Sequence, residues 1–196
     1  MKNQISKFIL NRGLAQIKRY HSTPLHQNET VAEHTFYVTI IARALCGLIE
    51  ENGTKVNTLE VLDKALVHDM EEMYSGDILQ PFKYADPELK RLVDKINDKL
   101  VDKAFEGLPD KLAKHFKHIW SDYHEGKRIE DKIVKMADRL SLIAYCLEQI
   151  KLGNTFMIEI LDNGIKLMEQ FEFKWLEPIL KDIKKERSSM KKNICD

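Results

Sequence analysis

Apolar residues recur at intervals of three and four positions along almost the whole chain, which is the spacing of one face of an α-helix. Only 8 glycines and 5 prolines interrupt the 196 residues, so the chain has few turn signals to separate its helices. We found no segment with the strict alternation of apolar and polar residues that is typical of a half-buried strand. The sequence therefore predicts an all-α protein, folded as a single compact helical bundle.

Capping and turn residues set the boundaries of the expected helices. Thr30, with Glu33 three positions later, forms a capping box in front of a helix that ends before Asn52-Gly53. Ser75-Gly76-Asp77 and then Pro81 mark a loop. The predicted helices cover residues 3–17, 31–51, 58–69, 87–105, 110–124, 128–152, 154–169 and 173–187.

Charge and cysteine content exclude some classes of partner and compartment. Lys plus Arg and Asp plus Glu number 31 each, so net charge gives no argument for binding nucleic acid or a membrane. Three widely spaced cysteines without a CxxC pair favour a reducing compartment. With no signal peptide and no long apolar run identified, we expect a cytoplasmic protein without a nucleic-acid or membrane partner. A nucleic-acid-binding arm in the basic segment Lys181–Asp196 is the less favoured alternative.

Four residues have side chains suited to a divalent metal ion. His34 interrupts the apolar face of the helix over 31–51, His68 and Asp69 end the next helix, and Asp138 lies at the edge of an apolar stripe. A carboxylate at that edge is costly unless a cation, a proton or a donor accompanies it. Imidazole nitrogens with carboxylate oxygens suit Mn, Fe, Co, Mg or Zn, and four protein ligands leave an octahedral ion two open positions. Taken singly, however, His34 could equally be a hydrogen-bonded core histidine and the His-Asp doublet a chance pair.

Three segments resemble the motifs of the HD-domain metal-dependent phosphohydrolases, a superfamily named for its His-Asp doublet. They are Val31-Ala32-Glu33-His34-Thr35, Val67-His68-Asp69-Met70-Glu71-Glu72 and Lys135-Met136-Ala137-Asp138-Arg139-Leu140. The loop segments Ser75-Gly76-Asp77 and Pro81-Phe82-Lys83-Tyr84, with the upstream Arg19-Tyr20, resemble those of the bacterial 5′-deoxynucleotidases and their eukaryotic HD-domain relatives.

This resemblance implies a fold, an activity and a cofactor. Residues 1–187 would form a single HD domain, with a basic, frayed tail over 188–196. The activity would be removal of phosphate from deoxynucleoside 5′-monophosphates by attack of a metal-activated water. His34, His68, Asp69 and Asp138 would bind one Co, Mn, Mg, Zn or Fe ion per subunit, and the protein would be a homodimer.

The resemblance also implies that a glutamate after the doublet holds or deprotonates the attacking water. If the helix continues past the doublet, Glu72 lies four residues after His68 and three after Asp69, on the same face. Glu71 lies three residues after His68 but only two after Asp69, so it points further away. We therefore favour Glu72 over Glu71, and each has the alternative role of a surface carboxylate near a helix end.

Substrate contacts also follow from the resemblance. Arg19 would bind phosphate, Asp77 the sugar 3′-hydroxyl, Tyr20 the sugar face, and Lys83 would add positive potential. As ordinary alternatives, Arg19 is a surface charge and Asp77 a turn residue. Two departures from the bacterial pattern leave the selection against ribonucleotides open: Tyr20 replaces a tryptophan and Leu79 a proline.

Competing functions remain at this point. A triphosphohydrolase of the same HD fold, which releases triphosphate from a dNTP, would use the same ligands. A non-catalytic nucleotide-binding module would usually lack one of them, and here the set is complete. A second metal site at His115, His118 and His124 is less favoured, because these residues lie in a polar, lysine-rich segment.

Overall fold

The computed structural model describes residues 4–194, and its regular elements over that span are helices. One isolated antiparallel bridge joins Lys18 to Thr30. The α-helices are α1 (Ile5–Ile9), α2 (Val31–Glu51), α3 (Thr58–Val67), α4 (Glu72–Ser75), α5 (Gln80–Lys83), α6 (Pro87–Ala104), α7 (Asp110–Glu125), α8 (Ile129–Lys151), α9 (Met157–Met168) and α10 (Glu177–Ile194), with 3₁₀ turns η1 (Gly13–Gln16) and η2 (Lys174–Leu176). The all-α prediction is confirmed.

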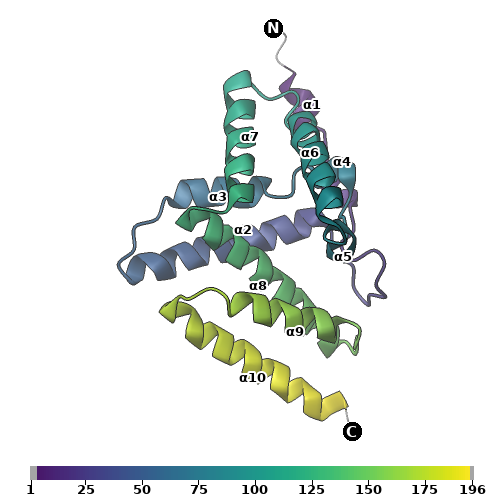
Figure 1. Cartoon of the computed structure of the whole chain (residues 1–196), viewed down its shortest axis with the longest axis vertical. Coiled ribbons are helices and arrows are strands. Elements are labelled where there is room, and N and C mark those ends of the chain that lie inside the picture. The colour runs from purple at the N-terminus through teal and green to yellow at the C-terminus, as the bar shows by residue number, and fades with distance from the viewer. Residues whose placement is uncertain (1–3, 195–196) are drawn as a thin grey trace.

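Helices α2 and α8, the two longest, pack against each other at the centre of the molecule, and α3 packs against both. Figure 1 shows α9 and α10 at one end of this central group, and α6 and α7 with the N-terminal α1 at the other. The predicted metal ligands lie on α2, just after α3, and on α8. The central three helices therefore bring together segments that are far apart in the sequence.

The apolar core consists of two clusters that meet near the His-Asp doublet. The larger cluster includes Val38 of α2 and Ala137 of α8, which are fully buried. The smaller cluster includes Val67 and Met70, which flank the doublet on either side, and packs them against buried residues of α6 and α7. His68 and Asp69 are thereby held between two packed regions rather than on a free loop.

The first turn of α2 is fixed by the predicted capping box. The Thr30 hydroxyl accepts a hydrogen bond from the backbone N–H of Glu33, and the Glu33 carboxylate accepts one from the N–H of Thr30 at 2.7 Å. Such a cap stabilises a helix by about 1 kcal/mol. Because the cap fixes where α2 begins, it also fixes the position of His34, which follows Glu33 directly and lies on the buried face.

A buried ion pair links α3 to α8. The Lys64 ammonium is fully buried and donates to the Asp131 carboxylate and, at 2.9 Å, to Glu60. A buried charge is tolerated only when it is paired in this way. The pair therefore fixes the register between the helix that leads to the doublet and the helix that carries Asp138.

The N-terminal segment differs from the single helix predicted over residues 3–17. Helix α1 ends at Ile9, and the chain then forms the 3₁₀ turn η1. The Asn11 side chain accepts a hydrogen bond from the N–H of Gly13 at 3.1 Å, which is a turn rather than a helix. A Cβ at Gly13 would lie 2.4 Å from Cγ of Met73, so this close approach requires glycine. Residue 3 lies outside the described part.

The C-terminal helix is longer than expected. Residues 188–194 continue α10, where a frayed tail over 188–196 was predicted. Arg187 donates to the Asp162 carboxylate of α9 at 2.9 and 3.0 Å, and Met190 is buried in the larger cluster. These contacts give the last turns of the helix a surface to pack on. Residues 195–196 lie outside the described part of the chain.

By length and composition alone, α2 passes a test for a membrane-spanning helix, with a mean hydropathy of 1.2. No such segment was expected, because charged residues interrupt the apolar runs of this helix. Length and composition do not distinguish a membrane helix from the core helix of a soluble protein. In the structure, α2 packs against α3 and α8 and contributes buried residues to the larger cluster.

Candidate active site

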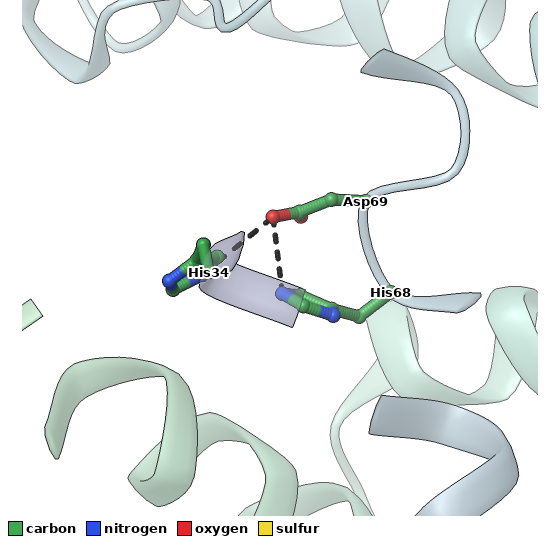
Figure 2. A group of neighbouring side chains, drawn as sticks. All are labelled: His34, His68 and Asp69. Carbon is green, nitrogen blue, oxygen red and sulfur yellow. Dashed lines mark ion pairs between the residues drawn. The ribbon is translucent and has the colours of Figure 1, made fainter. Parts of the chain in front are cut away.

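His34, His68 and Asp69 point their ligand atoms at one another, as Figure 2 shows. The Asp69 carboxylate oxygen Oδ2 lies 3.0 Å from Nε2 of His68 and 3.8 Å from Nε2 of His34. The three ligand atoms all lie within 4.8 Å of one another. Both imidazoles are buried, and Asp69 is half-buried. Helix α2 and the turn after α3 thus converge on a single point.

Asp138 of α8 joins the same cluster. Its Oδ1 atom lies 3.1 Å from Nε2 of His34. The structure therefore brings together all four of the predicted metal ligands. Of these, His34 and His68 are held by buried helices, whereas Asp69 and Asp138 present their carboxylates from the more open side.

The donor atoms suit a divalent metal ion. Nε2 of His34 and Nε2 of His68 are buried, and neither makes a hydrogen bond of good geometry among the described residues. Buried polar atoms without a partner are rare, and each calls for an explanation such as an ion. Metal–ligand bonds of about 2.0–2.2 Å place adjacent ligand atoms about 3 Å apart, which matches the spacing here.

The other ring nitrogens are held by protein groups. Nδ1 of His68 lies 2.8 Å from the Ala65 carbonyl, which only accepts, so Nδ1 carries a proton and Nε2 is the nitrogen that faces Asp69, where a metal ion would replace a proton. Nδ1 of His34 lies 3.1 Å from the Ser141 hydroxyl and 2.9 Å from Nη1 of Arg19, and a guanidinium only donates. Nδ1 therefore accepts from Arg19 in this arrangement, and in a metal-bound ring, whose Nε2 lone pair is used, Nδ1 would instead donate to Ser141. Such outer contacts fix the orientation of a ligating imidazole.

Electrostatics keep the two carboxylates ionised. Burial alone would raise the pKa of Asp69 and of Asp138, but His68 beside the first and His34 beside the second hold both below their usual range. Burial likewise disfavours the charged form of His68, yet the adjacent Asp69 raises its pKa to about 9. Burial and the nearby Arg19 charge lower the pKa of His34. The cluster is thus a set of opposite charges and neutral donors that a cation can join.

Glu71 and Glu72 have different environments. Glu71 is buried, and its Oε2 accepts a hydrogen bond from the Trp120 indole at 2.7 Å. Glu72 is half-buried, and burial followed by the charges of Asp69 and Asp77 raises its pKa well above the usual range. The Glu71 carboxylate is therefore occupied by its hydrogen bond to Trp120, whereas the charge of Glu72 interacts with those of Asp69 and Asp77.

The reasoning that favoured Glu72 rested on a helix that continues past the doublet, and that premise is wrong. Helix α3 ends at Val67, residues 68–71 form a turn, and α4 begins at Glu72. The N–H of Glu72 donates to the Asp69 carbonyl at 3.1 Å, so the turn is tight and keeps Glu72 near the doublet. Met70, one residue after the doublet, enters the smaller core cluster at this turn.

The Arg19-Tyr20 segment forms one wall of the site. Arg19 is buried, and its Nη1 donates to the Glu29 carboxylate at 2.5 Å. Tyr20 has a positive φ of 55°, and its N–H donates to the Asp77 carboxylate at 2.9 Å. The structure thus joins three predicted substrate-binding residues, Arg19, Tyr20 and Asp77, to one another and to His34.

Lys83 lies on α5, a different element from those that carry the metal ligands. It is half-buried at the last position of α5. Burial lowers the pKa of His124 of α7, and the positive charge of Lys83 contributes to that lowering. The positive charge of Lys83 therefore acts on His124 of α7.

Sequence reasoning missed three residues that support this site: Glu29, Ser141 and Tyr145. Ser141 and Tyr145 follow Asp138 by three and seven positions, so a helical projection of α8 places them on the face of Asp138. Helical spacing in the sequence could therefore have identified Ser141 and Tyr145. Glu29 lies in an irregular loop, where spacing gives no such signal.

Comparison with known families explains the arrangement. A family model described as YfbR-like 5′-deoxynucleotidase matches residues 8–186. The 5′-deoxynucleotidase of Photorhabdus laumondii is 33% identical over 145 residues, which covers 72% of this chain and 73% of that protein. The chain belongs to the YfbR-like 5′-deoxynucleotidase family. The family resemblance found in the sequence is confirmed, and the chain is a hydrolase.

Solved structures agree with this membership in the YfbR-like family. An HD-domain phosphohydrolase from Listeria innocua superposes with a TM-score of 0.80 at 26% identity, covering 94% of this chain and 89% of the other. The HD phosphohydrolase of cyanophage S-2L, solved with dA and one catalytic Zn²⁺, superposes with a TM-score of 0.56 at 16% identity over 92% of each chain. The second likeness shows the shared fold.

Proposed function

We propose that this member of the YfbR-like family removes the phosphate from deoxynucleoside 5′-monophosphates, with residues 1–187 as its catalytic domain. One observation carries the proposal: two buried Nε2 atoms that lack a hydrogen bond of good geometry among the described residues lie 3.0 and 3.1 Å from two ionised carboxylates. We assign His34, His68, Asp69 and Asp138 to one divalent ion. The relatives named as 5′-deoxynucleotidases, and the dA and Zn²⁺ bound by the cyanophage protein, support substrate and cofactor.

The bound metal would supply positive charge that neutralises a phosphate oxygen and lowers the pKa of a water molecule. Glu72 is proposed to hold that water and to accept its proton as the water oxygen attacks phosphorus. The bond from phosphorus to the sugar O5′ then breaks, and O5′ takes up a proton. The hydrogen bond from the Glu72 N–H to the Asp69 carbonyl at 3.1 Å supports this role, since it keeps a further carboxylate-bearing residue next to the cluster.

The remaining residues would bind the nucleotide. Arg19 is proposed to bind the phosphate, because Glu29 already orders its guanidinium and so reduces the entropy lost on binding. Asp77 is proposed to accept a hydrogen bond from the 3′-hydroxyl, and Tyr20 to lie against the sugar. Lys83 adds positive potential on the α7 side.

A product assay tests this function and its alternatives. The purified full chain, freed of metal by chelation, would be supplied in turn with Co, Mn, Mg, Zn or Fe, and then with dAMP, AMP or dATP. We expect metal-dependent release of phosphate from dAMP. Release of triphosphate from dATP as the main reaction would favour the triphosphohydrolase instead. Nucleotide binding without hydrolysis under every metal would identify a non-catalytic binding module.

We further propose that the enzyme is a cytoplasmic homodimer, with α2 at the interface. Phe36, Tyr37 and Ile40 share one side of this helix and expose 60%, 55% and 56% of their surfaces. A contiguous exposed apolar patch of this kind is typical of an interaction site. The cytoplasmic location rests on the charge and cysteine content of the chain.

A charge placed in this patch is expected to shift a dimer to a monomer. The substitution Ile40→Glu would bury a carboxylate at the interface, and sedimentation equilibrium would measure the mass. Leu59→Glu, at an exposed position of α3 outside the patch, is the matched control and should remain dimeric. A dimer that persists in the Ile40→Glu variant would contradict the proposed interface.

A further inference from the structure

The ring of Tyr145 lies directly against the ring of Tyr20. Their centroids are 5.7 Å apart and their planes differ by 9°, so the two rings are stacked. Tyr145 is buried and belongs to the larger core cluster, whereas Tyr20 is half-buried and packs against that cluster from the side of the site. Tyr145 therefore forms a rigid backing for a side chain that faces the substrate.

One hydrogen bond fixes Tyr145 in place, and a second, from Gln149, reaches the same carbonyl. The Tyr145 hydroxyl donates to the Gln27 carbonyl at 2.7 Å, and the buried Gln149 donates to the same carbonyl at 2.8 Å. The loop that follows Tyr20 is thus anchored to α8 by two side chains one helical turn apart. Neither contact involves a residue assigned to the metal or to the phosphate.

Tyr20 needs such support because of its backbone conformation. Its φ of 55° lies in the left-handed region, which is disfavoured for a residue with a side chain. The hydrogen bond from its N–H to Asp77 fixes the backbone. The stack on Tyr145 fixes the direction of the ring. Both the backbone and the ring of Tyr20 are therefore held in place.

We propose that Tyr145 is a positioning residue for sugar selection, which acts by preventing the Tyr20 ring from yielding to a ribose 2′-hydroxyl. The inference rests on the proposed function, in which Tyr20 lies against the sugar. A wall of a binding site excludes an additional hydroxyl only if the wall cannot move. Loss of the backing ring would let Tyr20 retreat into the space left behind, and a ribonucleotide would then fit.

The test compares Tyr145→Leu with Tyr145→Phe in the metal-loaded full chain. The ratio of kcat/KM for dAMP to kcat/KM for AMP is measured for each. Tyr145→Leu is expected to lower the ratio about tenfold, the scale on which a pocket distinguishes one small group, mainly through a lower KM for AMP. Tyr145→Phe keeps the stacked ring and should keep the ratio within about twofold. Gln149→Met, which removes the other anchor of Gln27, is the matched control and should leave the ratio unchanged.

Several outcomes would overturn the proposal. One is a Tyr145→Leu variant that melts at a lower temperature but keeps the unmodified ratio, since a purely structural role would produce it. Another is an unmodified chain that already hydrolyses AMP and dAMP equally well. If Tyr145→Leu does not fold, Tyr20→Ala removes the wall itself, and an unchanged ratio in that variant overturns the proposal as well. Failure of the proposed function is distinct, because the unmodified chain would then release no phosphate from either nucleotide.

Discussion

The Glu72→Ala variant is expected to bind metal and nucleotide normally but to lose turnover by about 10²–10⁴-fold, the range attributed to a positioned general acid or base. The reason is local: the hydrogen bond from its N–H to the Asp69 carbonyl at 3.1 Å holds Glu72 next to the doublet, but Glu72 is not one of the four assigned metal ligands. Phosphate release from dAMP would measure kcat, elemental analysis the metal, and equilibrium binding the nucleotide. A fall in kcat with little change in affinity marks a group needed only in the transition state.

Glu71→Gln is the matched control for this prediction. The amide oxygen of glutamine still accepts the hydrogen bond from the Trp120 indole, so the packing of Glu71 against α7 is preserved. We expect this variant to keep activity within about tenfold, since no chemical step is assigned to Glu71. A fully active Glu72→Ala variant together with an inactive Glu71→Gln variant would reverse the assignment.

Asp138→Asn is expected to abolish both metal retention and activity while leaving the helical fold intact. The substitution preserves the shape of the side chain but removes the charge that a divalent ion requires, next to His34 at 3.1 Å. Even the loss of an outer partner of a metal ligand costs 10–100-fold in affinity or activity, so we expect a loss of more than about 100-fold for a ligand itself. His68→Ala should behave in the same way.

Metal content after dialysis, circular dichroism and phosphate release would measure these three properties separately. Asp94→Ala, at the surface of α6 where the carboxylate pairs with Lys90, is a control that removes a charge far from the cluster. It should keep metal, fold and activity. A metal-free variant of Asp138 or His68 that still releases phosphate at the unmodified rate would refute the metal centre.

Sequence periodicity predicted those parts of the site that lie on regular helices. His34 was placed on the buried face of α2 by the apolar residues around it, and the structure confirms that burial. Helical spacing could also have identified Tyr145, because it shares a face of α8 with Asp138. Sequence periodicity did not predict the parts of the site whose backbone conformation depends on tertiary packing. The turn after Val67 places Met70 in the smaller cluster, and no local pattern distinguished this turn from a continuing helix.

The conformation of the loop from Arg19 to Glu29 depends even more on tertiary contacts. Its shape depends on a positive φ at Tyr20, a hydrogen bond to Asp77 and anchors on α8. Each partner lies more than fifty residues away in the sequence. Local propensity therefore predicts only that the segment is irregular. The resemblance to the deoxynucleotidases supplied the roles of Arg19 and Tyr20, and the structure supplied the contacts that hold them.

One face of α8 fixes the spacing of four residues that contact the site or the loop beside it: Asp138, Ser141, Tyr145 and Gln149. Seven residues of α-helix separate Asp138 from Tyr145, which corresponds to about 10 Å along the axis. If Tyr20 lies against the sugar as proposed, helix pitch sets the distance along α8 between the proposed metal ligand Asp138 and the residue that backs the sugar wall. Loop changes in relatives would alter which groups line the pocket, whereas the length of substrate it accommodates would stay constant.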